Sequence, residues 1–265
     1  MQDVFFGQYY LTDSIIHRLD ARLKIALTLI FAVLSFLIEN YAGAMYFFIF
    51  VFFIIMLSKV PFKIYFKSIK MVLLIILFTS IMNLFYSDGP IIFAIGSIRI
   101  TQTGMENSAF IALRLLLLFF VSSILTYTTS PSEFTHGIES LLRPLSVFKV
   151  NISNLSMMIT LALRFVPILL NEANKISAAQ KARGAQIDSG NLKKRVEALG
   201  GVIIPLFLVS FKKANDLAVA MESRCYSCER NRTKMKILKF KKIDYSALLF
   251  SLAVIVAFLI FNFQI

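Results

Sequence analysis

The chain has 265 residues, of which 58% are hydrophobic, and it carries 28 lysines and arginines against 15 aspartates and glutamates. No soluble domain of this length needs so much apolar surface, so the composition excludes a soluble globular protein and indicates an integral membrane protein. The N-terminus lacks a basic stretch and a small-residue cleavage site, so we expect the first apolar segment to be retained as a signal anchor. We attribute the net charge of +13 to membrane topology and anionic lipid rather than to nucleic acid.

Five apolar segments predict membrane-spanning helices. Four lie in the first half of the chain and one closes it, at residues 25–38, 42–57, 71–86, 109–127 and 245–263. Several are shorter than the ~20 residues that an untilted helix needs, so their ends must include flanking residues. The predicted fold is therefore an all-α integral membrane protein with about five transmembrane helices.

The basic residues predict the orientation of the chain. They crowd the loop after the second span and recur from residue 129 to the last span, whereas the loop 87–108 carries only Arg99. By the positive-inside rule we expect the N-terminus and residues 130–243 to be cytoplasmic. Five spans then place the C-terminus on the extracellular side of the cell membrane.

The chain divides into two predicted parts. Residues 1–129 and 244–265 form the membrane part, and residues 130–243 form a helical cytoplasmic coupling domain inserted before the last span. The insert opens with Ser130 or Ser132 as a helix cap and Pro131 in the first turn, which predicts a short amphipathic helix that ends near Pro144.

Two longer helices follow in the insert. They contain the apolar runs 155–170 and 199–211, each of which continues directly into a polar helix. We interpret these runs as the apolar parts of long helices that lie under or partly in the membrane, rather than as full spans.

The two long helices contain an internal repeat. "EANKISAAQKARGAQ" (172–186) aligns without a gap with "KANDLAVAMESRCYS" (213–227), and each ends in a small residue, an arginine and a small residue. Three interpretations stay open. The small residues can pack helix against helix. The arginine can complement the helix dipole, with Gly184 as the C′ residue, although Cys225 is a poor left-handed residue. The arginine can also enter an acidic groove on a partner protein.

The candidate metal and acid-base groups are few. His17 and Asp20 share a helix face, but two ligands make no metal site. We expect Asp20 to cap a helix or to pair locally, and Arg22 and Lys24 to anchor the first span at the headgroups. Cys225 and Cys228 form a lone C-x-x-C, and a zinc site needs further ligands, so free thiols are expected.

The chain has no nucleotide-binding P-loop and no protease or hydrolase motif, so any energy for transport must come from a partner. A stand-alone carrier or channel is the main alternative. It would need a polar substrate path inside the spans, and Asn83, Thr79 and Arg114 offer few polar groups for one. Arg114 is equally explained by snorkelling outward. A membrane-bound enzyme would need an acid, base or metal cluster. His17, Asp20, His136 and Glu139 match no such motif.

Four blocks of sequence, in this order, resemble one family: "GQYYLTDSIIHRLDARLK", "TSPSEFTHGIESLLRPL", "LALRFVPILLNEANKISAAQKARG" and "IPLFLVSFKKANDLAVAMESRCY". They are similar to the transmembrane T component (EcfT family) of energy-coupling factor transporters, ATP-driven importers of vitamins and transition metals. Ala21 stands where that family usually has proline. The resemblance implies a coupling subunit that binds no cofactor itself. Its partners would be two ABC-type ATPase subunits, which hydrolyse ATP, and a substrate-binding membrane subunit.

The resemblance also assigns a role to the two triplets. Ala182-Arg183-Gly184 and Ser223-Arg224-Cys225 correspond to the segments that dock on the two ATPases in that family. The second triplet departs from the family's Ala-Arg-Gly pattern at both outer positions. The identity of the substrate does not follow, because in that family it belongs to another subunit.

Overall fold

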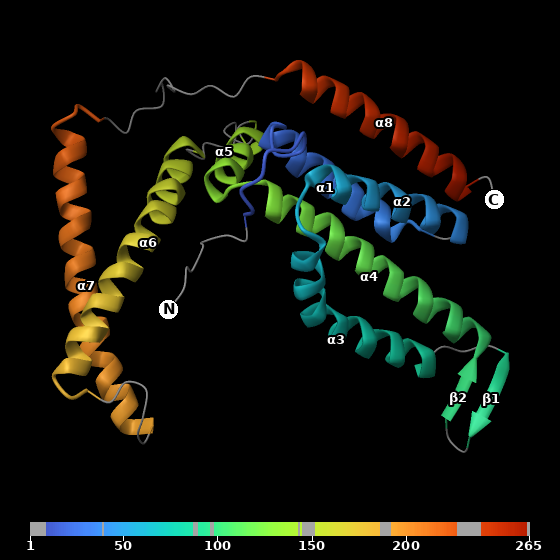
Figure 1. Ribbon diagram of the computed structural model, residues 1–265, viewed down its shortest axis with the longest axis horizontal. Helices are drawn as coiled ribbons and strands as arrows, with labels where there is room; N and C mark the ends of the chain where they lie inside the picture. Colours follow the sequence, from blue (N-terminus) through green and yellow to red (C-terminus); the bar gives the residue numbers. More distant parts are fainter. Residues whose placement is uncertain are drawn as a thin grey trace. The chain divides into compact units, whose positions relative to one another are not determined.

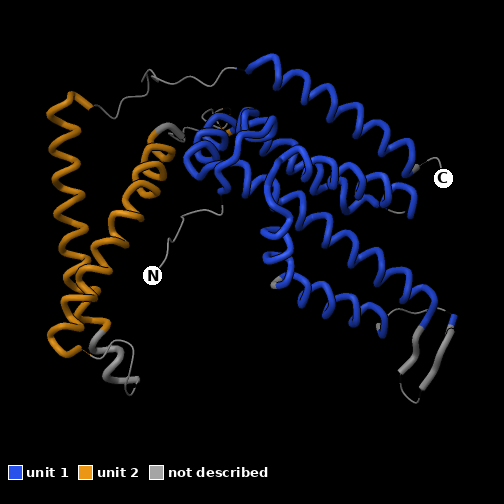
Figure 2. Tube along the Cα trace, viewed as in Figure 1, with its two compact units in different colours: residues 1–141, 236–265 blue, residues 142–235 orange. Residues whose placement is uncertain are grey.

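The computed structural model describes residues 9–38, 40–86, 90–95, 98–142, 144, 152–185, 192–226 and 240–263. The chain forms two compact units, which Figure 2 colours separately: Met1–Leu141 with Lys236–Ile265, and Leu142–Met235. Most of the short helix that opens the predicted insert 130–243 thus groups with the first unit. The functional division into a membrane part and a coupling part stays a prediction.

The first unit is a helical bundle with one small hairpin (Figure 1). Its helices are α1 (Ala21–Phe36), α2 (Tyr41–Ser58), α3 (Phe62–Tyr86), α4 (Gln102–Thr128), α5 (Pro131–Leu142) and α8 (Lys242–Phe263). The antiparallel strands β1 (Ile91–Ile95) and β2 (Ile98–Thr101) lie between α3 and α4. The fold is all-helical apart from this two-stranded hairpin, and the prediction that treated residues 87–108 as a loop is corrected there.

Helices α1, α2, α4 and α8 build an aromatic core. Phe47 and Phe258 are fully buried with their ring centroids 5.5 Å apart, and Phe31 packs on Phe50 at 4.9 Å. Aromatic pairs at such spacings add directional attraction to simple burial. Many large apolar side chains on the outside of the bundle stay exposed, as expected where lipid rather than water is the solvent.

Four helices of the described chain are long and apolar enough to cross a membrane, and the bent helix α3 makes a fifth. They include α2, α4 and α8, which confirms three of the predicted spans. The fourth is α6, from Asn154 to Ala182. It contains the run 155–170, which we interpret as lying under or partly in the membrane. The span predicted at 25–38 is not among them, because α1 has only 16 residues, or ~24 Å of helix.

Polar contacts fix α1 at its first turn. Asp20 is its N-cap and accepts a hydrogen bond from the Arg22 backbone N–H at 2.9 Å, as predicted. The Lys24 ammonium donates to the Thr128 carbonyl oxygen at 2.8 Å, and only 6% of the residue is exposed. The prediction that Lys24 anchors the span at the headgroups is therefore wrong. Asp244, at the start of α8, accepts from the Asp20 backbone N–H at 2.8 Å.

A second polar cluster joins the far end of α1 to α4 and α8. Arg114 donates to the Ile38 carbonyl oxygen, and the Asn262 side-chain amide donates to the Leu37 carbonyl oxygen at 2.8 Å. The Asn40 amide in turn donates to the Asn262 carbonyl oxygen at 2.9 Å. The last carbonyl groups of a helix have no partner within it. The Asn262 and Asn40 side chains supply partners for such carbonyl groups at Leu37 and Asn262. Arg114 binds the carbonyl group just beyond the α1 C-cap and does not snorkel outward.

The second unit is a pair of long antiparallel helices, α6 (Ile152–Ala182) and α7 (Leu192–Glu222). Glu172 and Lys213 form an ion pair at 3.3 Å, and the Gln180 side-chain amide donates to the Gly201 carbonyl oxygen at 3.1 Å. Figure 1 shows the helices crossing near the C-terminal part of α6 and diverging beyond it. Helix–helix contact is thus confined to one stretch of each helix.

Candidate functional site

The C-terminus of α6 is closed by two hydrogen bonds around Gly184. The Ala185 backbone N–H donates to the Gln180 carbonyl oxygen at 3.0 Å, and the Gly184 N–H donates to the Lys181 carbonyl oxygen at 3.0 Å. Gly184 has a φ of 89°, in the left-handed region that glycine enters without steric cost. This pairing is a Schellman motif, in which Arg183 is the C-cap residue.

The C-terminus of α7 repeats the same motif at matching positions. The Tyr226 N–H donates to the Met221 carbonyl oxygen at 3.0 Å, and the Cys225 N–H donates to the Glu222 carbonyl oxygen at 2.9 Å. Arg224 is the C-cap residue. Cys225 adopts the left-handed conformation with a φ of 56°, so the prediction that a cysteine argues against a cap at this end is wrong.

Both arginines remain available for another molecule. Arg183 and Arg224 are exposed, and neither side chain makes a hydrogen bond or ion pair with any residue that the structure describes. The Schellman bonds come from the backbone, so the guanidinium groups are not used in closing the helices. Capping and docking are therefore compatible in this geometry.

The small residues of the repeat do not pack the two helices together. The six positions are all exposed in the structure: Ala178, Ala179, Ala182, Ala218, Ala220 and Ser223. The contact between α6 and α7 instead uses the polar side chains of Glu172, Lys213 and Gln180. The packing interpretation is thus wrong within this chain, and the small faces beside the two arginines are uncovered.

The two triplets lie far apart on the helix pair. The end of α6 lies close to Gly201, which Gln180 contacts. Arg224 lies more than six helical turns further along α7, so roughly 30–35 Å separate the two arginines.

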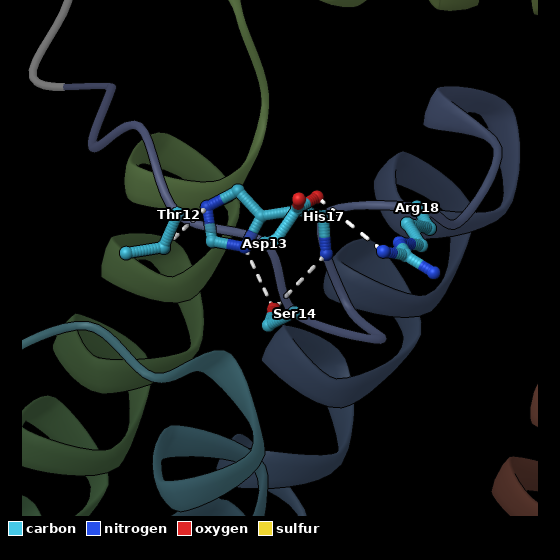
Figure 3. Close-up of polar contacts among 5 residues, drawn as sticks. All are labelled: Thr12, Asp13, Ser14, His17 and Arg18. Carbon is cyan, nitrogen blue, oxygen red and sulfur yellow. Dashed lines mark hydrogen bonds and ion pairs between the residues drawn. The ribbon is translucent and has the colours of Figure 1, made fainter.

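The other candidate residues serve local structure. Figure 3 shows the segment before α1, where the His17 Nδ1 lies 2.7 Å from the Ser14 hydroxyl and an ion pair of 3.7 Å joins Arg18 to Asp13. The His17 Nε2 lies 3.0 Å from the Tyr10 carbonyl oxygen, which can only accept, so Nε2 carries the proton. Burial lowers the pKa of His17 below its usual value. Both ring nitrogens are occupied, so this histidine is not poised as a metal ligand.

No metal-ligand cluster forms among the described residues. They contain no group of three or more His, Cys, Asp or Glu side chains that could hold a metal ion. His136 and Glu139 lie 3.7 Å apart on α5. Two of the polar side chains considered for a transport path bond within α3: the Asn83 amide donates to the Thr79 carbonyl oxygen at 3.0 Å, and the Thr79 hydroxyl donates to that of Ile75. Cys225 is a free, exposed thiol, and Cys228 lies outside the described residues.

The chain is similar along nearly its whole length to known proteins. A family model described as CbiQ, cobalt transport protein, matches residues 12–235. A protein of Thermosediminibacter oceani named energy-coupling factor transporter transmembrane protein EcfT is 42% identical over 247 residues, 93% of each chain. The proteins of the same name from Clostridium kluyveri and Bacillus subtilis are 41% and 38% identical, over 96% and 98% of this chain and 95% and 98% of their own.

The chain belongs to the EcfT family. It is thus a multi-pass membrane protein and the transmembrane T component of an energy-coupling factor transporter, a subunit without catalytic activity of its own. This confirms the resemblance found in the four sequence blocks and rules out the stand-alone carrier and the enzyme as accounts of the chain.

Two groups of polar contacts that join helices of this bundle were not predicted from the sequence. The Asp20, Lys24 and Asp244 contacts join α1, α4 and α8, and the Arg114 and Asn262 contacts join the same three helices at their other ends. The sequence feature that could have indicated these contacts is the presence of polar or charged residues at the ends of apolar segments. Their partners are backbone carbonyl and amide groups far away in the sequence, and no side-chain motif marks these.

Proposed function

We propose that the chain couples two ABC-type ATPase subunits to a separate substrate-binding membrane subunit during uptake of a vitamin or another micronutrient. The name that its relatives carry, energy-coupling factor transporter transmembrane protein, supports this role. The chain itself binds no cofactor in this proposal, and ATP is bound and hydrolysed by the ATPase subunits.

The observation that carries the proposal is the repeated helix end. Arg183 and Arg224 occupy the same C-cap position of two related helices, both side chains are exposed, and both are flanked by small exposed residues. A guanidinium at such a position can bind a carboxylate through two parallel hydrogen bonds. Small neighbours let the helix end enter a groove. We assign one triplet to each ATPase: Ala182-Arg183-Gly184 and Ser223-Arg224-Cys225.

The contact between α6 and α7 suits the transmission of motion. The two helices touch along a limited stretch that contains the Glu172–Lys213 ion pair, and they diverge beyond it. If the two docked ends move relative to each other, the helix pair can change its crossing angle about this stretch without opening an apolar core. The altered angle would then be passed to the membrane subunits.

The distribution of basic residues supports the orientation. Lysine and arginine dominate the segments before the first span, after the second span and from residue 129 to the last span. In the proposed topology these segments, both triplets and the N-terminus face the cytoplasm, and the C-terminus is extracellular at the plasma membrane.

A pull-down tests the proposal. The tagged chain is expressed in its native host, solubilised in mild detergent and compared with the Arg183→Glu, Arg224→Glu double variant. Two P-loop ATPases and a small membrane protein should co-purify with the unaltered chain, and the ATPases should be lost from the variant.

The matched control is Lys175→Glu, Lys212→Glu, which makes the same change in charge on the polar parts of α6 and α7 away from their ends. Both positions are exposed, and this variant should keep the ATPases. Normal recovery of the ATPases with the double variant, or equal loss with the control, contradicts docking through the triplets.

A further inference from the structure

The first two turns of α3 form a distinct surface that the coupling role does not use. Helix α3 bends by 52° between Phe62–Lys70 and Val72–Phe85, and the change of direction is visible in Figure 1. The segment before the bend follows the span α2 after only three residues and precedes the apolar second part of α3. Helix α2 is long and apolar enough to cross a membrane, so the three-residue connection places the lysine-rich start of α3 beside the membrane surface.

This segment is held on the bundle by one face. Tyr65 is only 2% exposed, and its ring packs edge-on against that of Tyr127 of α4 with centroids 5.1 Å apart. The hydroxyls of Ser68 and Tyr127 are hydrogen-bonded at 2.6 Å. The orientation of the segment about its own axis is therefore fixed.

The opposite face of the segment carries a row of lysines. Lys63, Lys67 and Lys70 are spaced by four and three residues, which places them on one side of the helix, and all three are exposed. Lys59, the exposed C-cap residue of α2, continues the cluster. We call these four lysines the basic elbow.

Nothing in the surrounding sequence neutralises the basic elbow. Residues 40–87 contain four lysines and no aspartate or glutamate. None of the four lysines forms an ion pair with a residue that the structure describes. Four like charges this close repel each other, and anions from outside the chain would reduce that repulsion.

Two aromatic side chains beside the lysines indicate that those anions belong to a membrane surface. Phe62 and Phe66 flank the lysine row and are 42% and 71% exposed. A helix with lysines on one side and exposed phenylalanines beside them is suited to the boundary between headgroups and acyl chains. An acidic protein surface would match the lysines but would leave the two phenylalanines facing a polar partner.

We propose that the basic elbow binds the phosphate groups of anionic phospholipids, with Phe62 and Phe66 inserted among the acyl chains. Anionic headgroups then hold the bend of α3 at a fixed depth. Each lysine near an anionic membrane surface strengthens binding about fivefold, so the three lysines of α3 together account for a change of about a hundredfold. This proposal does not depend on the coupling role, since it involves no partner protein.

The test is native mass spectrometry of the full chain in detergent, titrated with phosphatidylglycerol or with phosphatidylcholine. The unaltered chain should bind phosphatidylglycerol in preference, and the triple variant Lys63→Gln, Lys67→Gln, Lys70→Gln should lose at least tenfold in affinity for it. The triple variant with arginine at the same positions should keep binding, because charge rather than lysine is required.

The matched control is Lys175→Gln, Lys181→Gln, Lys212→Gln, which removes the same charge from α6 and α7 and should bind phosphatidylglycerol normally. Three outcomes overturn the proposal. They are unchanged lipid binding by the α3 glutamine variant, an equal loss in the control, and displacement of the lipid by millimolar inorganic phosphate, which would indicate a site for the free ion. Unchanged lipid binding together with loss of a co-purifying protein would assign the surface to a protein partner instead.

Discussion

Glu172 and Lys213 occupy equivalent positions in the two halves of the internal repeat, and they contact each other at 3.3 Å. In an antiparallel pair of related helices, equivalent residues meet where an approximate twofold axis passes between them. The ion pair therefore marks the symmetry centre of α6 and α7. Two residues that align in the sequence repeat thus contact each other directly in the fold.

The first prediction concerns the strength of this central ion pair. Glu172→Gln and Lys213→Gln should each lower the free energy of unfolding, and the double variant should show a coupling energy of about 0.3–1 kcal/mol between them, because both side chains are partly exposed. The measurement is a double-mutant cycle by thermal unfolding in detergent. Lys175→Gln removes the longer contact to Glu172, at 3.8 Å, and should have a smaller effect. Additive single effects would show that the pair contributes nothing.

The second prediction concerns the two helix ends. Cys225→Gly should stabilise the end of α7 by about 1 kcal/mol, because glycine adopts the left-handed conformation without the steric cost that a side chain brings. Gly184→Ala should destabilise the end of α6 by a similar amount, although a Cβ at Gly184 has nothing within 4 Å to collide with. Amide hydrogen exchange over the last turn of each helix measures both effects. Changes of the same sign in the two variants would contradict the backbone explanation.

Much of the fold was predictable because long apolar runs have few alternatives to a membrane helix. The helix starts were also predictable, since Asp20 and Ser130 cap the helices that follow them through contacts within three residues. The prediction for Cys225 failed because it relied on the low preference of cysteine for the left-handed conformation. The need of the last carbonyl groups of α7 for hydrogen-bond donors outweighs that preference.

The prediction for Lys24 and the snorkelling alternative for Arg114 failed for a different reason. A basic residue at the edge of an apolar segment has the same sequence signature whether it reaches the headgroups or turns into the bundle. Lys24 turns inward to a carbonyl oxygen 104 positions away, and Arg114 to one 76 positions away. No local pattern contains such contacts, so they become visible only in the folded chain.

The third prediction tests the close approach of α5 to α1. A Cβ at Gly137 would lie 2.8 Å from the Ile25 Cδ1 and 3.3 Å from the Ala21 backbone carbon. Gly137→Ala should therefore destabilise the first unit by about 1–3 kcal/mol through overpacking. Gly200→Ala is the matched control, because that glycine lies within α7 with nothing within 4 Å, and there the change should stabilise the helix by about 0.5–1 kcal/mol. Thermal unfolding in detergent distinguishes the two signs, and a stable Gly137→Ala variant would show that α5 does not pack tightly on α1.

The fourth prediction concerns the carbonyl group that Arg114 binds. Arg114→Met should destabilise the bundle by about 1–3 kcal/mol, because the carbonyl oxygen of the fully buried Ile38 loses its charged donor. The control Arg18→Met removes a surface arginine whose ion pair with Asp13 is exposed on both sides, and it should cost less than about 0.5 kcal/mol. Equal midpoints of thermal unfolding for the two variants would contradict the role of Arg114 at the end of α1.

The last prediction is a pH dependence of the segment before α1. Burial holds the pKa of His17 below its usual value of 6.5, so the folded chain favours the neutral ring that accepts from Ser14 and donates to Tyr10. The unfolded chain takes up a proton at a higher pH than the folded one. Stability from this contact is therefore complete above pH ~6.5 and is lost progressively as the pH falls below that value.

Unfolding of the full chain in detergent at pH 7.5 and at pH 5.5 measures this effect. The drop in midpoint temperature between the two pH values should be smaller in His17→Gln than in the unaltered chain, because the amide can keep a hydrogen bond but does not titrate. His136→Gln is the matched control, since His136 is exposed on α5, and it should keep the full drop. A His17→Gln variant with an unchanged drop would assign the pH dependence to other groups, of which Asp13 and Lys24 are the charged ones that act on His17.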